Sequence, residues 1–480
     1  MPDQPYNQST ARNLGVWIFS VSIVYSALAY GTTTAVTRFV LDGILLSGFL
    51  ATCAGRLGQK KSLLCSSRLI FILLGIQLMG SLYLLNPKAR FNPVTEVLSP
   101  LEDAVPWLPG SYDIALSWPV VLHFACLSLA LVALVDLMHE SANRWKMLRI
   151  IAITGFGVAV IGIYQKASGA GSMLWTSKEY PPTFFAAFRY HGNAAAYLNL
   201  CWPAALAMLL RVLREDPRNI LAKSFWISAL AFTFGGLLVN TSKYGHAIAF
   251  VCMIAVLMIG ISRISQFGGK RRLIVVITGV VFLSMFVILS MFSGDVIFAR
   301  WDEAMNSGVS FKRRLLAYGT ALEMWQGAPL WGYGPGSFVL LFRYFSVPAG
   351  KELGGKWSFA HNDYLQSLTE WGLAGSLLIF AVFGIGIWLL WKYYRRTQRA
   401  SYSAMAALLG LLLVSLHIVV DFSLQIGAMQ IIALVYVSFG WAGAPKRNRR
   451  AGTVTSRHSH EWANPETGSG RSRHRRSRRR

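Results

Sequence analysis

Long apolar runs are the feature of this sequence that most limits how the chain can fold. Runs of about 18 or more mainly apolar residues recur along most of the 480 residues, and a helix of that length crosses a hydrocarbon layer roughly 30 Å thick. Charged residues make up only 14% of the chain, whereas soluble domains carry about 25%. The sequence therefore predicts an all-α, polytopic integral membrane protein.

The apolar runs divide into about twelve predicted spans, which together occupy residues 14–443. They cover residues 14–35, 39–55, 68–86, 117–137, 148–167, 193–211, 224–241, 245–262, 273–293, 369–391, 403–421 and 424–443. Lys and Arg are concentrated in alternate short loops, such as 56–68 and 392–399, and cytoplasmic loops carry such an excess. Both termini are therefore expected in the cytoplasm, with residues 1–13 as a short N-terminal segment and the first run retained as a span.

The dominant outer loop, residues 293–369, lies between the ninth and tenth predicted spans. Loops of that length in compact proteins usually carry function. Apolar residues at helical spacing predict an amphipathic helix over 309–326, and Pro329 with the glycines after it predicts a turn. A second helix is expected to begin near Asn362 and to continue into the tenth span. We expect the chemistry of the protein in this loop.

Charge and cysteine content limit the kinds of site. The formal net charge of +25 belongs largely to cytoplasmic loops and the tail 444–480, so it does not indicate nucleic-acid binding. The tail is predicted to be disordered and attracted to anionic lipid, with a specific partner or nucleic acid as the alternative. None of the five cysteines lies in the long outer loop, and no cluster has metal-ligand spacing, so we expect no disulfide framework, metal or cofactor.

His361 is the leading candidate for a catalytic residue. A neutral histidine can accept the proton of a sugar hydroxyl, and a positioned base accelerates such reactions about 10²–10⁴-fold. Asp363 and Glu370 are close enough in sequence to orient the imidazole or to bind sugar hydroxyls. Asn362 and Gln366 add donors and acceptors for the same substrate. The alternative is structural, because Asn and Asp are favoured where a helix begins and a histidine beside them can simply pack.

Cations on the outer side form the second candidate group. These cations lie in or beside outer loops, where positive charge is less usual, and they are Arg189, Lys243, Lys312, Arg313, Arg314 and Arg343. Several cations that converge at a membrane surface suit a pyrophosphate, because guanidinium groups donate paired hydrogen bonds to phosphate oxygens. The alternative is that each cation extends to the interface or pairs with an acidic residue of the same loop.

The glycine-rich turn contains Gly332, Gly334, Pro335 and Gly336. It resembles a phosphate-binding loop but lacks the Lys-Ser/Thr pair of that motif. A structural turn that fixes the loop over the site is the better interpretation.

Three ionisable residues fall within or at the ends of predicted spans: His123, His417 and Asp421. Ionisable groups inside a membrane are functional candidates. A hydrogen-bonded pair in the protein interior, such as His417 with Asp421, is the commoner outcome.

These stretches resemble the O-antigen ligase and O-antigen polymerase (Wzy-type) superfamily of polytopic membrane glycosyltransferases. The residues that carry the resemblance are Arg314, Tyr318, PLWGYGPGSF at 329–338 and HNDYLQSLTEWG at 361–372, with YHGN at 190–193 and NTSKYG at 240–245 upstream. The resemblance is strongest over residues 185–375, and the number of spans and the position of the outer loop extend it to the whole chain.

The resemblance implies a GT-C-like fold and an inverting reaction, independent of metal and nucleotide, at the periplasmic face of the bacterial inner membrane. The donor would be a polyprenyl-pyrophosphate-linked glycan, and the acceptor a hydroxyl of another glycan, of lipid A core or of another molecule. His361 would activate the acceptor hydroxyl, while Arg314, Arg189 and Lys243 would neutralise the pyrophosphate. The chain departs from the family pattern at Lys243, where the family has arginine, and at Tyr244, where it has glycine.

Several functions share such a site. Ligase, polymerase and protein O-glycosyltransferase differ in their acceptors, and the sequence does not separate them, although we lean to a ligase. A flippase for lipid-linked glycans is the main alternative of another class, and a scaffold protein is the third. Transporters place polar residues within their spans and often show repeats or broken helices, whereas this chain concentrates polar residues in one outer loop.

Overall fold

The computed structural model describes residues 6–175, 183–262, 309–347, 353, 357–396 and 401–443, all within one unit, Met1–Pro445. Several predictions lie outside the described residues. They concern the first residues of the N-terminal segment, the ninth span at 273–293, the beginning of the outer loop at 293–308 and the basic tail 444–480.

Within these ranges the chain forms α-helices and one small hairpin. The helices are α1 (Tyr6–Leu28), α2 (Ala35–Gly58), α3 (Ser67–Leu85), α4 (Ile114–Leu137), α5 (Ser141–Ala167), α6 (His191–Glu215), α7 (Ile220–Val239), α8 (Lys243–Ser262), α10 (Val309–Gly327), α11 (Phe338–Ser346), α13 (Asp363–Arg396), α14 (Tyr402–His417) and α15 (Gly427–Ala442). The hairpin pairs β1 (Ala89–Asn92) with β2 (Val97–Pro100) in antiparallel register, Ala89 opposite Pro100.

The helices fall where the apolar runs predict them. Every predicted span other than 273–293 coincides with a helix. In the described part of the chain, α2 to α7 and α13 are long and apolar enough to cross a membrane, and shorter apolar helices lie in α1, α8, α14 and α15. The all-α class is therefore confirmed, with the hairpin as an addition to it, and the length and composition of the helices are consistent with a multi-pass membrane protein. The number of crossings and their orientation stay predictions.

Small residues let the helices approach one another closely. A Cβ atom at Gly155 of α5 would lie 2.3 Å from the Cβ of Cys201 on α6. A Cβ atom at Gly236 of α7 would lie 2.9 Å from the Cβ of Ala159 on α5. Close backbone contacts at glycine are common between membrane helices, where no hydrophobic effect drives association.

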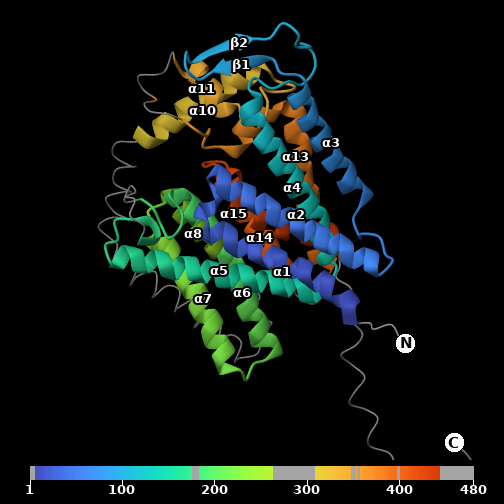
Figure 1. Cartoon of the computed structure of the whole chain (residues 1–480). Helices are drawn as coiled ribbons and strands as arrows, with labels where there is room; N and C mark the ends of the chain where they lie inside the picture. The colour runs from blue at the N-terminus through green and yellow to red at the C-terminus, as the bar shows by residue number, and fades with distance from the viewer. Residues whose placement is uncertain are drawn as a thin grey trace, which may run out of the picture. The chain divides into compact units, whose positions relative to one another are not determined.

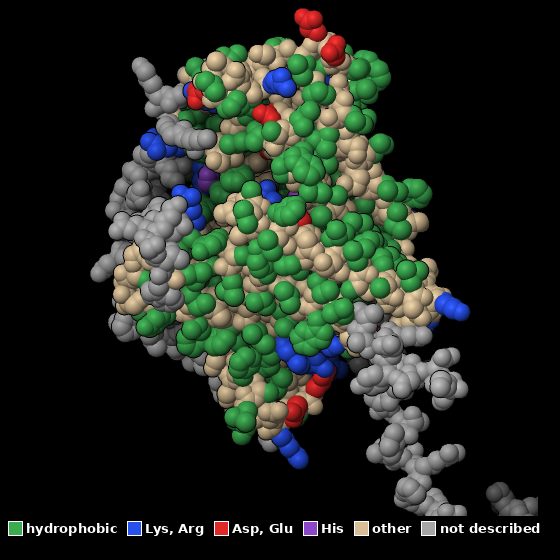
Figure 2. Space-filling view, viewed as in Figure 1, with side chains coloured by type: hydrophobic (Ala, Val, Ile, Leu, Met, Phe, Trp, Pro, Cys, Tyr) green, Lys and Arg blue, Asp and Glu red, His purple; other side chains and the backbone are tan. Residues whose placement is uncertain are grey.

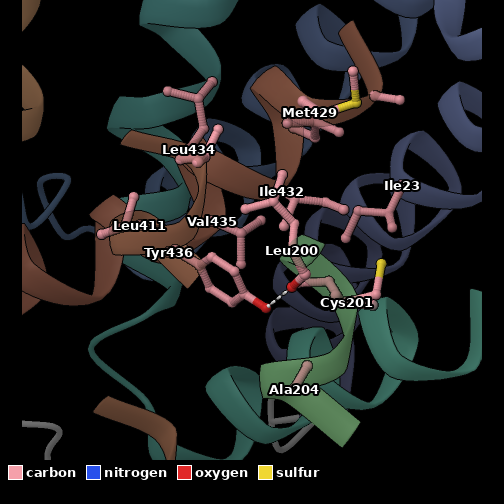
Figure 3. Close-up of a cluster of buried hydrophobic side chains, with 14 of the residues drawn as sticks. Ile23, Leu200, Cys201, Ala204, Leu411, Met429, Ile432, Leu434, Val435 and Tyr436 are labelled. Atoms are coloured by element: carbon pink, nitrogen blue, oxygen red, sulfur yellow. Dashed lines mark hydrogen bonds between the residues drawn. The ribbon is translucent and has the colours of Figure 1, made fainter. Parts of the chain in front are cut away.

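Helix α15 forms the middle of the hydrophobic core, and nearly all of its residues are buried. Figure 3 shows Ile432 and Val435 of this helix among side chains from other helices. The Tyr436 hydroxyl donates a hydrogen bond of 2.6 Å to the carbonyl oxygen of Leu200 on α6. This bond satisfies a buried polar group and joins α15 to α6, which begins beside the candidate site.

Both helices predicted in the outer loop are present, as α10 and the first part of α13. α10 and α11 lie near the hairpin (Figure 1), where the Tyr344 hydroxyl of α11 donates to the Glu96 carbonyl oxygen at 2.9 Å. α13 is interrupted at Gly372, whose φ is 62° and ψ is −172°. The glycine-rich turn packs against this interruption, because the Gly334 amide donates to the carbonyl oxygen of Glu370 at 2.9 Å.

The contact between the turn and α13 requires glycine at position 332. Gly332 has a φ of +69°, which lies in the left-handed region. A Cβ atom there would also lie 2.5 Å from the Gly372 nitrogen and 2.7 Å from the carbonyl carbon of Glu370. Substitution would therefore strain the backbone and push the turn away from the helix.

We expect Gly332→Ala to lower the stability of the folded protein by about 1–3 kcal/mol, the usual cost of a left-handed non-glycine residue. Thermal unfolding of the purified protein in detergent measures the loss. The matched control is Gly319→Ala in α10, where a Cβ atom would meet nothing within 4 Å and helix propensity favours alanine by about 0.5–1 kcal/mol. Equal unfolding temperatures for the two variants would contradict this account of the turn.

Candidate active site

His361 immediately precedes the N-cap of α13 and has a left-handed backbone conformation. Its φ is +52°, which non-glycine residues adopt rarely and at a cost of about 1–3 kcal/mol. The Tyr318 hydroxyl of α10 donates to the His361 carbonyl oxygen at 2.8 Å and holds the backbone there. Burial raises the pKa of Tyr318 to about 12, so the hydroxyl keeps the proton that it donates.

The His361 imidazole stands among aromatic rings but is not enclosed. The ring centroids of Trp357 and Phe422 lie 5.4 and 4.8 Å from its own, each nearly perpendicular to it. The side chain remains 24% exposed. The neighbouring rings therefore restrict the orientation of the imidazole and still leave it accessible to a ligand.

A buried carboxylate lies beside the histidine. Asp421 Oδ1 is 3.3 Å from His361 Nδ1, and the Asp421 side chain is only 2% exposed. We assign a proton to Nδ1, because a carboxylate accepts hydrogen bonds, and Nε2 is then the proton acceptor of the ring. The sequence pairs Asp421 with His417 instead, but His417 Nε2 is 3.9 Å from the carboxylate. In the sequence, Asp421 is indicated as a candidate functional residue only by its position, because it is an acidic residue at the end of an apolar span.

Arg314 of α10 lies next to this pair. Its guanidinium donates to the Val420 carbonyl oxygen and, at 3.1 Å, to the Tyr190 hydroxyl, and it lies 4.8 Å from the centre of the Tyr244 ring. Burial opposes its charge, but nearby Tyr190 and Asp421 raise the pKa of Arg314 above its usual value. Arg314 is therefore a held cation, because these two hydrogen bonds fix its guanidinium.

The other two predicted cations are neighbours of the residues that Arg314 contacts. Arg189 is exposed and precedes Tyr190, whereas Lys243 is half-buried and is the first residue of α8, before Tyr244. The segments that carry them are tied together, because the side-chain Nδ2 of Asn240 donates to the His191 carbonyl oxygen at 3.1 Å. The structure thus brings together the chain segments of all three predicted cations.

The first two residues after His361 serve the local fold. Asn362 Oδ1 accepts a hydrogen bond of 3.0 Å from the Leu365 amide, as a helix cap does. Asp363 accepts from the Leu424 amide at 2.7 Å and from the Gln425 side chain at 3.0 Å. The structural alternative therefore describes both residues, and direct contact of either with substrate stays a prediction.

Gln366 and Glu370 are the next two predicted polar residues along α13, and both are buried. Gln366 Oε1 accepts from the Ala360 amide at 3.1 Å, and its Nε2 donates to Glu370 Oε1 at 3.2 Å. The same Glu370 oxygen accepts from the Phe338 amide at 3.4 Å, just after the glycine-rich turn. These two side chains link the segment that carries His361 to the turn, and their role in binding glycan stays a prediction.

The glycine-rich turn lies against the loop that precedes α4. Cβ atoms at Gly334 and Gly336 would lie 2.8 Å from the Ser111 Cα and 2.7 Å from the Leu116 carbonyl oxygen. The carbonyl oxygen of Pro335 accepts from the Ser117 hydroxyl at 2.7 Å. The turn is thus packed between two helices rather than presented to a ligand.

Figure 2 shows a recess in one face of the molecule, with histidine and Lys or Arg side chains in and beside it, whereas hydrophobic side chains cover most of the surface below. Within the described ranges, no group of three or more His, Cys, Asp or Glu residues is placed to hold a metal ion. Metal independence of the reaction stays a prediction.

Comparison with known proteins supports the resemblance seen in the sequence. Residues 228–380 match the family model described as O-antigen ligase. The matched range contains Lys243, Arg314, the glycine-rich turn and His361, whereas Arg189 and Asp421 lie outside it. No curated protein matches the chain.

We expect Asp363→Ala to destabilise the protein by about 1–3 kcal/mol for each partly buried partner that it leaves unsatisfied, the Leu424 amide and the Gln425 side chain. Thermal unfolding in detergent measures the effect. Asn362→Ala is the matched control, because it removes a single cap and should cost about 0.5–2 kcal/mol. Unchanged unfolding of Asp363→Ala together with weaker glycan binding would instead show that Asp363 contacts the substrate.

Proposed function

Residues 228–380 belong to the O-antigen ligase family, and from this premise we propose that the protein is a ligase-like membrane glycosyltransferase. It transfers a glycan from polyprenyl pyrophosphate to a hydroxyl of an acceptor, at the periplasmic face of a bacterial inner membrane, in lipopolysaccharide or exopolysaccharide biosynthesis. The observation that carries this proposal is the accessible His361, paired with buried Asp421 and flanked by the held cation Arg314.

His361 acts as the general base. As the acceptor oxygen attacks the anomeric carbon of the donor sugar, His361 Nε2 takes the hydroxyl proton. The imidazolium that forms keeps its Nδ1–H toward the Asp421 carboxylate, whose negative charge stabilises it. Because His361 is held by Tyr318 and by aromatic rings, its orientation is set before the acceptor arrives.

The cations act on the leaving group. The bond between the anomeric carbon and the pyrophosphate oxygen breaks as the new glycosidic bond forms, and negative charge grows on the pyrophosphate. Arg314, Arg189 and Lys243 stabilise that charge, which is most effective when the donors are fixed in advance. Arg314 meets this condition because Val420 and Tyr190 hold its guanidinium.

The acceptor distinguishes the related functions. A polymerase would use a second lipid-linked glycan, a ligase lipid A core, and a protein O-glycosyltransferase a protein hydroxyl, all with the same base and cations. A flippase would need no base, so the packing of His361 against a buried carboxylate favours transfer over transport.

We expect His361→Ala to lower glycan transfer by about 10²–10⁴-fold while the protein still folds and inserts. The assay uses purified protein, a radiolabelled polyprenyl-pyrophosphate oligosaccharide and EDTA, and it measures released polyprenyl pyrophosphate with lipid A core or a second lipid-linked glycan as acceptor. Histidine-dependent release supports a metal-independent transferase, and the productive acceptor separates ligase from polymerase. Normal product from the alanine variant would rule out the base assignment. Movement of labelled lipid across vesicles without release would favour a flippase.

We expect Lys243→Arg to keep or mildly improve transfer, because a guanidinium fork matches phosphate oxygens at least as well as an ammonium group. Lys243→Ala should weaken transfer, since it removes one positive charge from the pyrophosphate site. Initial rates at several donor concentrations measure both effects. A loss of activity in Lys243→Arg would show that the compact ammonium group is specifically required.

A further inference from the structure

A buried histidine within the helix bundle joins three helices. His123 lies on α4, between Asp42 of α2 and Gln430 of α15. His123 Nδ1 is 2.5 Å from Asp42 Oδ1, and His123 Nε2 is 2.7 Å from Gln430 Oε1. The side chains of Asp42 and His123 are buried. The functional assignment above uses none of these three residues, although the sequence marks His123 as an ionisable residue within a predicted span.

The hydrogen bonds of Gln430 give this group a direction. Gln430 Nε2 donates to the Leu424 carbonyl oxygen at 2.8 Å, which turns the amide oxygen of Gln430 toward His123. Both atoms that face the imidazole nitrogens are then acceptors, so His123 donates from both nitrogens and is positively charged. Its charge compensates the Asp42 carboxylate in a buried ion pair. A row of hydrogen-bond donors thus leads from His123 through Gln430 to the backbone of Leu424.

Leu424 is held through both of its backbone polar groups. Its carbonyl oxygen accepts from Gln430, and its amide donates to Asp363 Oδ2 at 2.7 Å. The other oxygen of the Asp363 carboxylate accepts from Gln425 Nε2 at 3.0 Å. Asp363 is two residues after His361 in the sequence. Leu424 therefore connects the buried group within the bundle to the segment that carries the proposed base.

The turn that contains Leu424 also positions the Asp421 carboxylate. Leu424 lies in the short 3₁₀ helix η5 (Ser423–Gln425), directly after Phe422. The Phe422 amide donates to Asp421 Oδ1 at 3.0 Å, and the same oxygen is 3.3 Å from His361 Nδ1. A displacement of this turn would therefore move the carboxylate relative to the imidazole.

Stability does not explain why a buried ion pair occupies this place. Removing two charges from water costs about as much as their attraction returns, and replacing such a pair by apolar side chains is often neutral or stabilising. Ionisable side chains within membrane-spanning segments are costly and usually serve function. What Asp42 and His123 provide, and apolar side chains would not, is a fixed orientation of the Gln430 amide and thus a fixed place for one backbone carbonyl.

We propose that Asp42, His123 and Gln430 are positioning residues of the transferase. They hold the backbone of Leu424 from inside the bundle, and they thereby keep the Asp421 carboxylate directed at the proposed base. They act through the polypeptide backbone rather than on the substrate. This inference rests on the proposed transferase function and extends its machinery from the outer loop into the helix bundle.

The test replaces Gln430 by an apolar side chain of similar length. Gln430→Met removes the link between His123 and Leu424. We expect kcat to fall by about tenfold to a hundredfold, because a small misplacement of a catalytic group has an effect of that size. The KM values for donor and acceptor should stay within about twofold of the wild type, since no substrate-binding group is removed. Initial rates of polyprenyl pyrophosphate release, with each substrate varied in turn, measure both quantities.

A conservative variant separates hydrogen bonding from charge. In Asp42→Asn the new amide can donate to His123 Nδ1, and a neutral imidazole still donates from Nε2 to Gln430. The row of donors that ends at Leu424 is then intact, so kcat should stay within about threefold of the wild type. A loss as large as that of Gln430→Met would show that the charge of the pair carries the effect, and it would overturn the proposal.

The matched control is Tyr436→Phe, which removes a different buried hydrogen bond from the same helix. The Tyr436 hydroxyl donates to the Leu200 carbonyl oxygen at 2.6 Å and is not bonded to the turn. We expect this variant to lower the unfolding temperature about as much as Gln430→Met does, because each loses a buried hydrogen bond, and to leave kcat unchanged. An equal loss of kcat in both variants would show only that α15 has been loosened, and it would overturn the proposal.

An unchanged kcat in Gln430→Met would overturn the proposal as well. If Gln430→Met does not fold, Gln430→Glu decides by the same criterion, because a carboxylate still accepts from His123 but does not donate to Leu424. Failure of the transferase function itself is distinguishable, because wild-type protein would then release no polyprenyl pyrophosphate with any acceptor.

Discussion

The candidate site depends on how the irregular segment 418–426 satisfies its backbone hydrogen bonds. This segment joins two apolar helices, and unpaired backbone groups near a bilayer cost several kcal/mol each, roughly as much as several ordinary hydrogen bonds contribute. The Ile418 carbonyl oxygen accepts from the Asp363 amide, and the Leu424 amide donates to the Asp363 carboxylate. Arg314 satisfies Val420 in the same segment. The groups that make the segment stable are therefore the groups that place Asp421 against His361.

The HNDYLQSLTEWG stretch divides into one accessible residue, the proposed base, and several buried residues that are bonded within the protein. His361 is partly exposed, whereas Asp363, Gln366 and Glu370 are buried and bonded within the protein. Glu370 and Gly372 hold the glycine-rich turn, one through its side chain and the other by allowing close backbone contact. The hydrogen bonds of this stretch thus fix the segment that carries His361, and contact of its buried residues with substrate stays a prediction.

The sequence predicts the helices, the large outer loop, His361 and the convergence of three cationic segments, because apolar length and residue chemistry are local properties. Contacts between distant segments are not local. Asp421 pairs with His361, which is 60 positions away in the sequence. The spacing of His417 and Asp421, four residues apart, favours a pair between these two residues instead, and it does not indicate the distant partner. In the same way, the sequence does not show that the Asp363 carboxylate accepts a hydrogen bond from the amide of Leu424, 61 positions away.

Two electrostatic environments meet at the histidine, and the reaction chemistry requires them to differ. The pyrophosphate gains negative charge only as its bond to the anomeric carbon breaks. Cations that neutral partners hold in place therefore stabilise the transition state more than the bound donor. Arg314, held by Val420 and Tyr190, is such a cation. An acceptor hydroxyl is neutral and gives up a proton, so strong positive charge around it would serve no purpose in binding. In the proposed reaction the acceptor hydroxyl meets instead the His361–Asp421 pair, in which Asp421 Oδ1 lies 3.3 Å from His361 Nδ1. A transferase with a charged leaving group and an uncharged nucleophile needs this asymmetry across its base.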